Sequence, residues 1–277
     1  MGKTWFVTGA SRGFGRVFVE AALERGDRVA AAARNIEMLS DLVERYGDAI
    51  LPLALDVTSE SQVKSAVRSA HDTFGRLDIV INNAGYGLFG TAEEVSLQQV
   101  RDQMETNFFG AVSVTNEVIP ILRQQGSGHI VQISSIGGVT TFPTLSAYHA
   151  SKWALEGYSD SIAQELAGFG INVTIVEPGG FDTDWAGSSA TFVEQMPEYA
   201  GVRTALSQMF ATPSPKPLGF GTAILAVVDA EQPPLRVFFG EAPLRLLPDV
   251  YKGRLDTWES WSSVARLAEG EYSPREN

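Results

Sequence analysis

A repeated alternation of short apolar runs with longer segments of helical periodicity constrains the fold of this chain more than any other feature of its sequence. The apolar runs lie at 3–8, 28–33, 50–55, 78–82, 129–134 and 171–177, and the helical segments at 13–25, 36–45, 60–74, 96–123 and 148–169. Nearly continuous apolar strands are typical of strands that helices cover on both faces. Because right-handed crossovers join parallel strands, the pattern predicts an α/β fold, a doubly wound parallel sheet of the Rossmann type flanked by helices.

A single domain over residues 1–277 is expected, because a chain of this length fits one α/β core. Residues 181–217 mix aromatic residues with serine, glycine and four prolines, which is too irregular for a sheet core. Long loops in compact domains are usually functional or disordered, so this segment is predicted to be a mobile excursion over the substrate. A helix at 218–230 and a strand at 235–239 are expected to follow, with 241–277 as a tail that is at best amphipathic.

The overall charge narrows the classes of partner. A net charge of −12, from 21 basic and 33 acidic residues, argues against nucleic acid and against an anionic membrane surface. No apolar run approaches the ~20 residues of a membrane span. The chain has no cysteine and strand-like sequence begins at Lys3, so a cytoplasmic protein without a signal peptide is expected. His71, His129 and His149 are scattered away from metal-ligand spacing, so no metal site is expected.

A glycine-rich turn joins the first predicted strand to the first predicted helix. Gly9, Gly13 and Gly15 let the backbone approach a pyrophosphate, whose charge is favoured by the amides of a helix N-terminus. Their spacing differs from the G-x-G-x-x-G fingerprint, and a purely structural glycine turn is the alternative. The position after the first strand of a βαβ series favours a phosphate cradle.

Two arginines bear on the choice of cofactor. The second strand ends in four alanines followed by Arg34, without the acid that binds ribose hydroxyls in NAD sites. Arg34 can pair with a 2′-phosphate in a bidentate manner, and Arg12 in the glycine loop adds a second cation. The pattern therefore favours NADP(H), with NAD(H) possible. The alternative is that both arginines are solvated surface charges.

Chemistry-bearing residues also follow the later strands, at the sheet edge where ligands bind in open parallel sheets. Asp56 follows the third strand and could accept a hydrogen bond from adenine, the 82–85 turn follows the fourth, and Ser134 and Ser135 end the fifth. Tyr148 and Lys152 stand four positions apart, on one face of a helix. A nearby ammonium favours the phenolate of a tyrosine, which makes the pair a candidate acid/base.

Taken together, these motifs resemble the short-chain dehydrogenase/reductase family in its main, single-domain form. The motifs are Thr-Gly-x-x-x-Gly-x-Gly at 8–15, Asn-Asn-Ala-Gly at 82–85, Thr-Asn-Phe-Phe-Gly at 106–110, Ser-Ser at 134–135, Tyr-x-x-x-Lys at 148–152 and Pro-Gly-x-x-x-Thr at 178–183. The resemblance covers residues 3 to about 185. Phe14, where an aliphatic residue is usual, is a minor departure. The overall layout is similar to the subgroup of 17β-hydroxysteroid and retinol dehydrogenase-like enzymes.

The resemblance implies roles for individual residues. Tyr148 is expected to be the acid/base and Lys152 to lower its pKa and to bind the nicotinamide ribose. Ser135 is expected to bind the substrate oxygen, and Asn107 to hold a water that links the lysine to solvent. The residues expected to bind the cofactor are Gly9, Ser11, Arg12, Gly13, Phe14, Gly15, Arg34, Asp56, Val57, Asn83, Ala84, Gly85, Tyr148, Lys152, Pro178, Gly179 and Thr183.

These expectations describe an NADP(H)-dependent oxidoreductase that interconverts a hydrophobic secondary alcohol and its ketone, or an aldehyde. A ketone that accepts hydride develops charge on its oxygen, which a positioned donor and a proton source stabilise. A catalytically idle NADP(H) sensor that binds a partner protein is the alternative, although it predicts a damaged set of catalytic residues. Relatives usually pair through the helices at 96–123 and 148–169, so a homodimer or homotetramer is expected.

Overall fold

The central element of the protein is a seven-stranded parallel sheet. The computed structural model describes residues 2–183, 185, 187, 189–209 and 213–270. The strands run in the order β3-β2-β1-β4-β6-β7-β9, so that the chain winds outward from β1 in both directions. Their bounds are Thr4–Thr8 for β1, Arg28–Ala33 for β2, Ile50–Ala54 for β3, Ile79–Asn82 for β4, Gly128–Ile133 for β6, Ile171–Pro178 for β7 and Arg236–Phe239 for β9.

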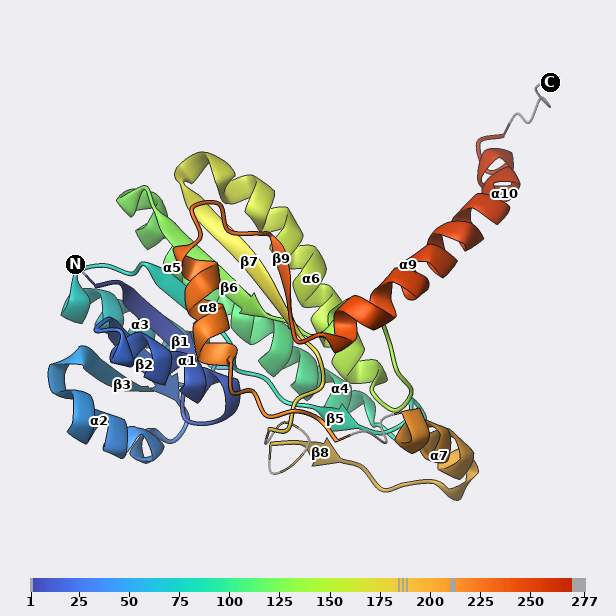
Figure 1. The fold of residues 1–277 in the computed structure, drawn as a ribbon, viewed down its shortest axis with the longest axis horizontal. Coiled ribbons are helices and arrows are strands. Elements are labelled where there is room, and N and C mark those ends of the chain that lie inside the picture. Colours follow the sequence, from blue (N-terminus) through green and yellow to red (C-terminus); the bar gives the residue numbers. More distant parts are fainter. Residues whose placement is uncertain (1, 184, 186, 188, 210–212, 271–277) are drawn as a thin grey trace.

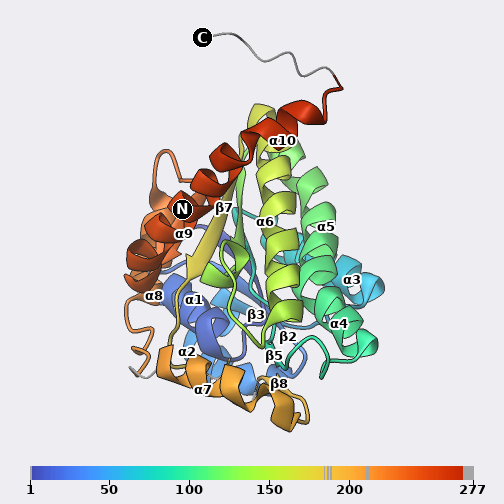
Figure 2. The ribbon, with the colours of Figure 1, turned by 90° about the vertical axis from the view of Figure 1, so that its right-hand side faces the viewer.

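Helices cover both faces of this sheet (Figures 1 and 2). One layer contains α1 (Gly13–Glu24), α2 (Ser40–Tyr46) and α8 (Phe220–Asp229). The other contains α3 (Glu60–Phe74), α4 (Leu97–Met104), α5 (Gly110–Gln125) and α6 (Ser146–Leu166). The predicted α/β class and doubly wound parallel sheet are confirmed, because every ladder between neighbouring strands is parallel.

The two layers give the protein two apolar cores, one on each face of the sheet. Alternate residues of β1 divide between them: Trp5 packs with α1 and α8, whereas Phe6 packs with α3 and α5, and both are fully buried. This division explains the continuous apolar character of the strands, since each side chain has a helix to face. The alanines of β2 are buried as well, which leaves room for helices to approach the sheet closely.

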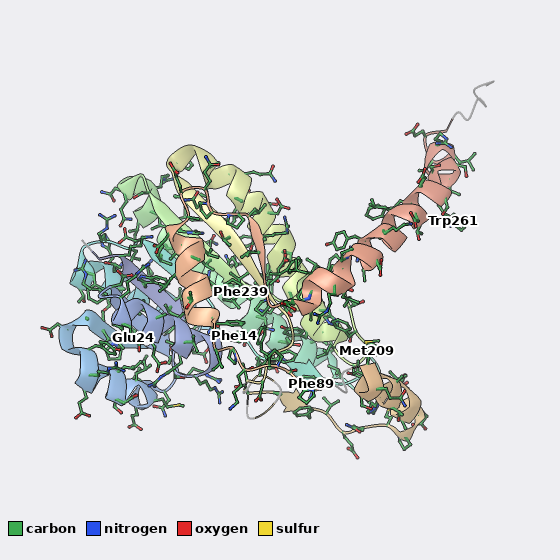
Figure 3. The ribbon with its side chains drawn as sticks, in the orientation of Figure 1. Phe14, Glu24, Phe89, Met209, Phe239 and Trp261 are labelled. Atoms are coloured by element: carbon green, nitrogen blue, oxygen red, sulfur yellow. The ribbon has the colours of Figure 1, made fainter. Side chains whose placement is uncertain are left out.

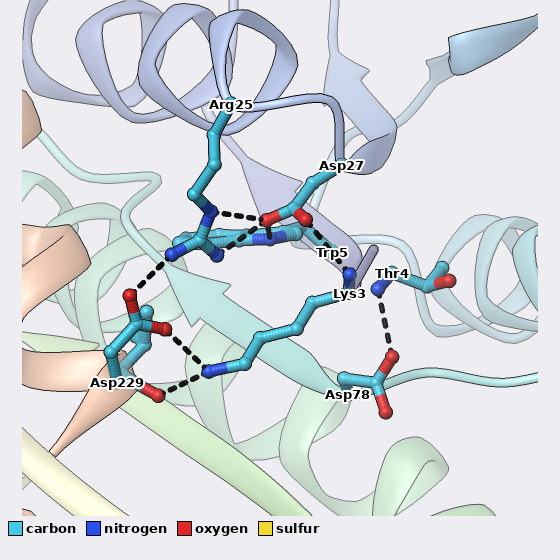
Figure 4. A network of polar contacts seen from close by, with 8 residues as sticks. Lys3, Thr4, Trp5, Arg25, Asp27, Asp78 and Asp229 are labelled. Atoms are coloured by element: carbon cyan, nitrogen blue, oxygen red, sulfur yellow. Dashed lines mark hydrogen bonds and ion pairs between the residues drawn. The ribbon is translucent and has the colours of Figure 1, made fainter. Parts of the chain in front are cut away.

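A buried carboxylate holds the start of the sheet together (Figure 4). Asp27 is 4% exposed and accepts hydrogen bonds from the Lys3 amide and the Trp5 indole, both at 2.8 Å. Arg25 pairs with Asp27 and also reaches Asp229 at 2.6 Å, while the Lys3 ammonium contacts Asp229 at 2.7 Å. The network joins β1, the turn before β2 and the end of α8.

Three parts of the structure depart from the sequence expectations. The predicted helix at 96–123 is two helices, α4 and α5, joined by a π-helical turn at Glu105–Phe109. The 181–217 segment contains a short strand, β8 (Thr191–Phe192), and a helix, α7 (Ala200–Met209). β8 pairs with β5 (Leu88–Phe89) in a second, two-stranded sheet.

The C-terminal region is more regular than the expected tail. It forms two helices, α9 (Ala242–Ser260) and α10 (Ser262–Leu267). Within α9, only Pro243 and Leu247 are buried. Figures 1 and 3 show the two helices projecting away from the body of the protein, with Trp261 far from the sheet.

Candidate active site

The glycine loop between β1 and α1 is fixed by the turn that follows β4. Gly9 has a φ of +64°, which favours glycine. A Cβ on Gly15 would lie 2.2 Å from the Gly9 carbonyl oxygen, so no larger residue fits there. The Asn83 side chain donates to the carbonyl oxygens of Thr8 at 3.0 Å and Gly9 at 3.1 Å. The Thr8 hydroxyl in turn accepts a hydrogen bond from the backbone amide of Asn83 at 3.0 Å.

The start of α1 is suited to an anion. Arg12 is the N-cap residue with an extended backbone, and its side chain does not cap the first turn. A Cβ on Gly13, whose φ is +55°, would meet no described atom within 4 Å. Unsatisfied amides at a helix N-terminus attract phosphate groups. The loop therefore fits the pyrophosphate of a dinucleotide, with Ser11 half-buried inside it.

The residues that end β2 and β3 lie along the same edge of the sheet. Arg34 is exposed directly after β2, and among the described side chains no ion pair to it is found. The carboxylate of Asp56 accepts from the amide and the hydroxyl of Thr58, at 3.0 and 2.8 Å. Val57 packs against the start of α5, since a Cβ on Gly110 would lie 2.6 Å from its side chain.

Tyr148 lies at the start of α6 and is 6% exposed. The Ser135 hydroxyl forms a hydrogen bond with Tyr148 that lowers the pKa of the phenol, but burial outweighs it and raises that pKa to about 12. Ser135 also accepts from the Gly137 amide at 3.0 Å, which orients the hydroxyl. The Trp185 ring packs on the tyrosine ring with the two centroids 4.9 Å apart.

Lys152 follows one turn later and is also buried. Its ammonium donates to the Ile133 carbonyl oxygen at 2.7 Å and lies 5.9 Å from the centroid of the Tyr148 ring. Burial lowers the pKa of Lys152 to about 8, although Glu156 counteracts this effect. The expectation that Lys152 lowers the pKa of Tyr148 needs correction, because loss of solvent dominates at the phenol. The phenol is therefore protonated at neutral pH, as a proton donor must be.

Asn107 connects three segments around the lysine. It lies in the π-helical turn, is 1% exposed and forms hydrogen bonds with both backbone groups of Tyr86, each at 3.0 Å. Its amide also donates to Ser151 at 3.1 Å, and Ser151 donates to the Tyr148 carbonyl oxygen at 2.7 Å. A Cβ on Gly85 would lie 3.1 Å from Asn107 Oδ1 and 3.8 Å from Lys152 Nζ, so both side chains face this glycine.

The loop after β7 lies beside this centre. Pro178 is buried and Gly179 half-buried, and the Gly179 amide donates to the Phe239 carbonyl oxygen at 2.9 Å. Thr183 accepts from the Trp185 amide at 3.3 Å. Phe14 stacks on Phe220 of α8, with the ring centroids 4.2 Å apart, so it anchors the glycine loop to a neighbouring helix.

Aromatic side chains form a wall around Tyr148. The Phe89 ring lies 5.2 Å from Trp185 and stacks on Phe192 at 4.8 Å, centroid to centroid. The 181–217 segment is attached to the body at Glu94, which pairs with Arg203 and accepts from the Met196 amide at 2.6 Å. Sequence reasoning gave Ser151 no role and included Trp185 only among the aromatic residues of the irregular 181–217 segment. The single signal for Ser151 was its place inside the Tyr-x-x-x-Lys motif.

The part of the chain that the structure describes has neither a metal-binding cluster nor a helix that could span a membrane. There, no cluster of three or more histidine, aspartate or glutamate side chains could hold a metal ion. None of the helices within the described residues has the length and apolar character needed to span a membrane.

The sequence is similar to known proteins over most of its length. The family model for short chain dehydrogenases matches residues 3–193. The chain is 45% identical over 245 residues to Oxidoreductase BOA17 of Botryotinia fuckeliana, covering 87% of this chain and 89% of the relative. It is 35% identical to a 3-ketodihydrosphingosine reductase of Bacteroides thetaiotaomicron, covering 84% and 86%.

The fold has a similar solved structure as well. A short-chain dehydrogenase from Streptomyces avermitilis superposes with a TM-score of 0.90 at 38% identity, covering 97% of this chain and 99% of that one. The family match spans more than half of the chain, and the sequence relatives extend over most of the rest. This chain belongs to the short-chain dehydrogenase/reductase family, whose members are oxidoreductases that bind NAD(P)(H).

Proposed function

We propose that this protein is an NADP(H)-dependent oxidoreductase that interconverts a hydrophobic secondary alcohol and its ketone, or an aldehyde, with Tyr148 as the acid/base. One observation carries the proposal: a buried, protonated tyrosine contacts Ser135, has Lys152 one turn away and lies under an aromatic wall. The glycine loop, which accommodates a pyrophosphate, lies at the same edge of the sheet.

The side chains have complementary roles in carbonyl reduction. Tyr148 holds the proton and delivers it to the oxygen as negative charge develops there. The Ser135 hydroxyl donates a hydrogen bond to the same oxygen, and Lys152 supplies positive charge behind the phenol. A bound nicotinamide supplies the hydride. Gly9, Gly13 and Gly15 bind the pyrophosphate, while the residues of the loop after β7 hold the nicotinamide.

The preference for NADP(H) rests on Arg34. This exposed guanidinium ends β2 without a described carboxylate partner, so it is available to a 2′-phosphate. Replacing it by alanine should weaken NADPH binding by roughly 10- to 100-fold, as expected for a lost charge-assisted contact, and leave NADH binding nearly unchanged. Arg68→Ala, an exposed arginine on α3, is the control. Equal losses for both cofactors would show that Arg34 does not read the phosphate.

The substrate class rests on the apolar character of the wall around Tyr148. Phe89 packs edge to face on Trp185 and stacks on Phe192, and such apolar surfaces bind apolar ligands. The relative named as a 3-ketodihydrosphingosine reductase acts on a ketone, which agrees with this class. The excursion at 181–217 is proposed to close this site and to set its specificity.

Activity against a panel of apolar ketones and aldehydes tests the proposal. Wild-type protein should oxidise NADPH with at least one member, and Tyr148→Phe should lower the rate by a factor of at least ~100, the usual size of general acid catalysis. Tyr158→Phe, on the same helix, should keep the wild-type rate. Activity that survives Tyr148→Phe would refute the mechanism. NADPH binding without any turnover would favour the idle sensor.

A further inference from the structure

The projecting C-terminal helices carry more exposed apolar surface than any requirement of the fold explains. In the arm, defined as residues 242–267, eight large apolar side chains are 40% to 65% exposed. They are Leu244, Leu246, Tyr251, Leu255, Trp258, Trp261, Val264 and Leu267. Leu244, Tyr251 and Trp258 repeat at seven-residue spacing, which is typical of a helix that packs along its length against another protein surface.

The body of the protein offers a matching surface beside the middle of the arm. An open hollow of about 580 Å³ is lined by Phe142, Pro143, Ala150 and Trp153, among others. Arg254 stacks on both Trp153 and Tyr251, at 5.1 and 5.0 Å from the ring centroids. The hollow and the arm are thus parts of one continuous surface.

We propose that the arm is a dimerisation element that packs on the arm and hollow of a second copy of this chain. A two-fold axis would use the same surface twice. Three of the eight half-exposed side chains are aromatic, each with roughly 150 to 250 Å² of surface, and with the five aliphatic ones they supply on the order of 700 Å², near the ~800 Å² per partner of a stable interface. The arm carries four basic and three acidic residues, without the cationic excess that favours a membrane surface.

Association of the full-length protein tests this surface. The double variant Trp258→Glu/Trp261→Glu should lose one association step in sedimentation velocity, or weaken it at least tenfold, whereas the control Lys252→Ala should associate as the wild type does. An unchanged association state in the double variant would overturn the proposal. So would tryptophan-dependent sedimentation with phosphatidylcholine–phosphatidylserine vesicles while the protein stays monomeric. Neither readout depends on catalytic activity.

A second, independent feature is a pair of buried carboxyl groups behind the candidate active site. Glu156 of α6 is 5% exposed and Glu177 of β7 is 1% exposed. Arg236 of β9 faces both, with its Nε 3.2 Å from a Glu156 oxygen and 3.7 Å from a Glu177 oxygen. The guanidinium also reaches Asp160, at 2.9 Å near the surface.

Burial disfavours the ionised form of both carboxyl groups. Burial raises the pKa of Glu177 to about 8, and its contact with Glu156 raises it further against the effect of Arg236. Burial also raises the pKa of Glu156, while Arg236, Lys152 and Ser134 lower it. Ionisation of both groups at once is therefore disfavoured, because two adjacent carboxylates cannot both ionise readily.

This pair contacts or adjoins three of the segments that form the candidate active site. Glu156 follows Lys152 by one helical turn, and Glu177 directly precedes Pro178. A Cβ on Gly138 would lie 2.5 Å from the Ser134 hydroxyl and 3.0 Å from a Glu156 oxygen, so these groups are closely packed. The segments that carry the lysine, the serine and the nicotinamide loop thus meet at the carboxyl pair.

We infer that Glu156 and Glu177 are positioning residues for Lys152: their shared negative charge keeps the buried ammonium protonated, and their shared proton joins α6 to the loop after β7. This inference rests on the proposed function. Without the charge on Glu156, the desolvated ammonium would lose its proton at lower pH, because Glu156 counteracts the effect of burial on the pKa of Lys152.

Glutamine substitutions separate the two roles. Glu156→Gln should move the alkaline limb of kcat/KM for ketone reduction to lower pH by about one unit, whereas Glu177→Gln should leave the limb in place and raise the KM for NADPH. Asp160→Asn, which removes a more exposed charge from the same arginine, is the control. An unmoved limb in Glu156→Gln would overturn the inference.

Stability against pH gives a readout that needs no turnover. The folded-state pKa of Glu177, about 8, exceeds its ordinary value, so its contribution is fully present below the unfolded pKa and is lost as the pH rises through about 8. Glu177→Gln should remove this decline from urea titrations. If the decline persists, the shared proton is refuted. If it disappears while Tyr148→Phe stays active, the carboxyl pair stands and the proposed function fails.

Discussion

Replacing Asn107 by alanine should destabilise the protein by about 3 kcal/mol, since three hydrogen bonds are lost at ~1 kcal/mol each. The amide and carbonyl of Tyr86 would lose these partners in a partly buried site, which adds to the cost. The Ser151 hydroxyl would lose a donor too. Asn107→Asp keeps the acceptor for the Tyr86 amide but loses both donated bonds, so it should be destabilising by about 2 kcal/mol or more.

Urea unfolding monitored by tryptophan fluorescence would measure these differences. Asn116→Ala provides the matched control, because this asparagine is exposed on α5 and, among the described residues, accepts a single 3.4 Å contact from Tyr158. Its effect should stay within ~0.5 kcal/mol. A loss below about 1 kcal/mol for Asn107→Ala would refute the reasoning that this side chain joins the π-helical turn, the Tyr86 segment and α6.

Three further outcomes are expected. Alcohol oxidation needs the Tyr148 phenolate, so its rate should rise with pH toward the phenol pKa of about 12. Ketone reduction needs the phenol, so its rate should show no limb from Tyr148 between pH 6 and 9. The same pH profile for oxidation and reduction would contradict this assignment. Gly15→Ala should abolish NADPH binding in a fluorescence titration, because the added carbon would lie 2.2 Å from the Gly9 carbonyl oxygen. Asp27→Ala should cost ~2 to 4 kcal/mol in urea titrations, since it leaves the buried Trp5 indole and the Lys3 amide without their acceptor, while Arg25 keeps its contact with Asp229.

Local sequence pattern was sufficient to predict the positions of the sheet strands, because helices cover both faces of the sheet. The predicted runs at 28–33 and 171–177 match β2 and β7 to within one residue. Periodicity fails where helical geometry changes without a change in composition: the segment around Asn107 keeps an apolar pattern, yet its backbone adopts a π-helical turn.

Tertiary contacts explain the other differences. Helix α7 is attached through the ion pair of Arg203 with Glu94, more than 100 residues earlier in the chain, which no local pattern reveals. The pKa of Tyr148 was expected to fall because of a nearby lysine, but burial of the phenol raises it instead. Spacing identifies which residues meet, whereas burial decides their protonation.

Hydride transfer itself provides the most direct test of the central claim, that Tyr148, Ser135 and Lys152 form a reductase site. NADPH carrying deuterium at the transferable C4 position would be incubated with a ketone that the protein turns over, and the alcohol analysed by mass spectrometry. Wild-type protein should deliver one deuterium to the carbinol carbon, and Tyr148→Phe should bind the cofactor but yield at most ~1% as much labelled alcohol in the same time. Labelled alcohol formed at the wild-type rate by Tyr148→Phe would contradict the account.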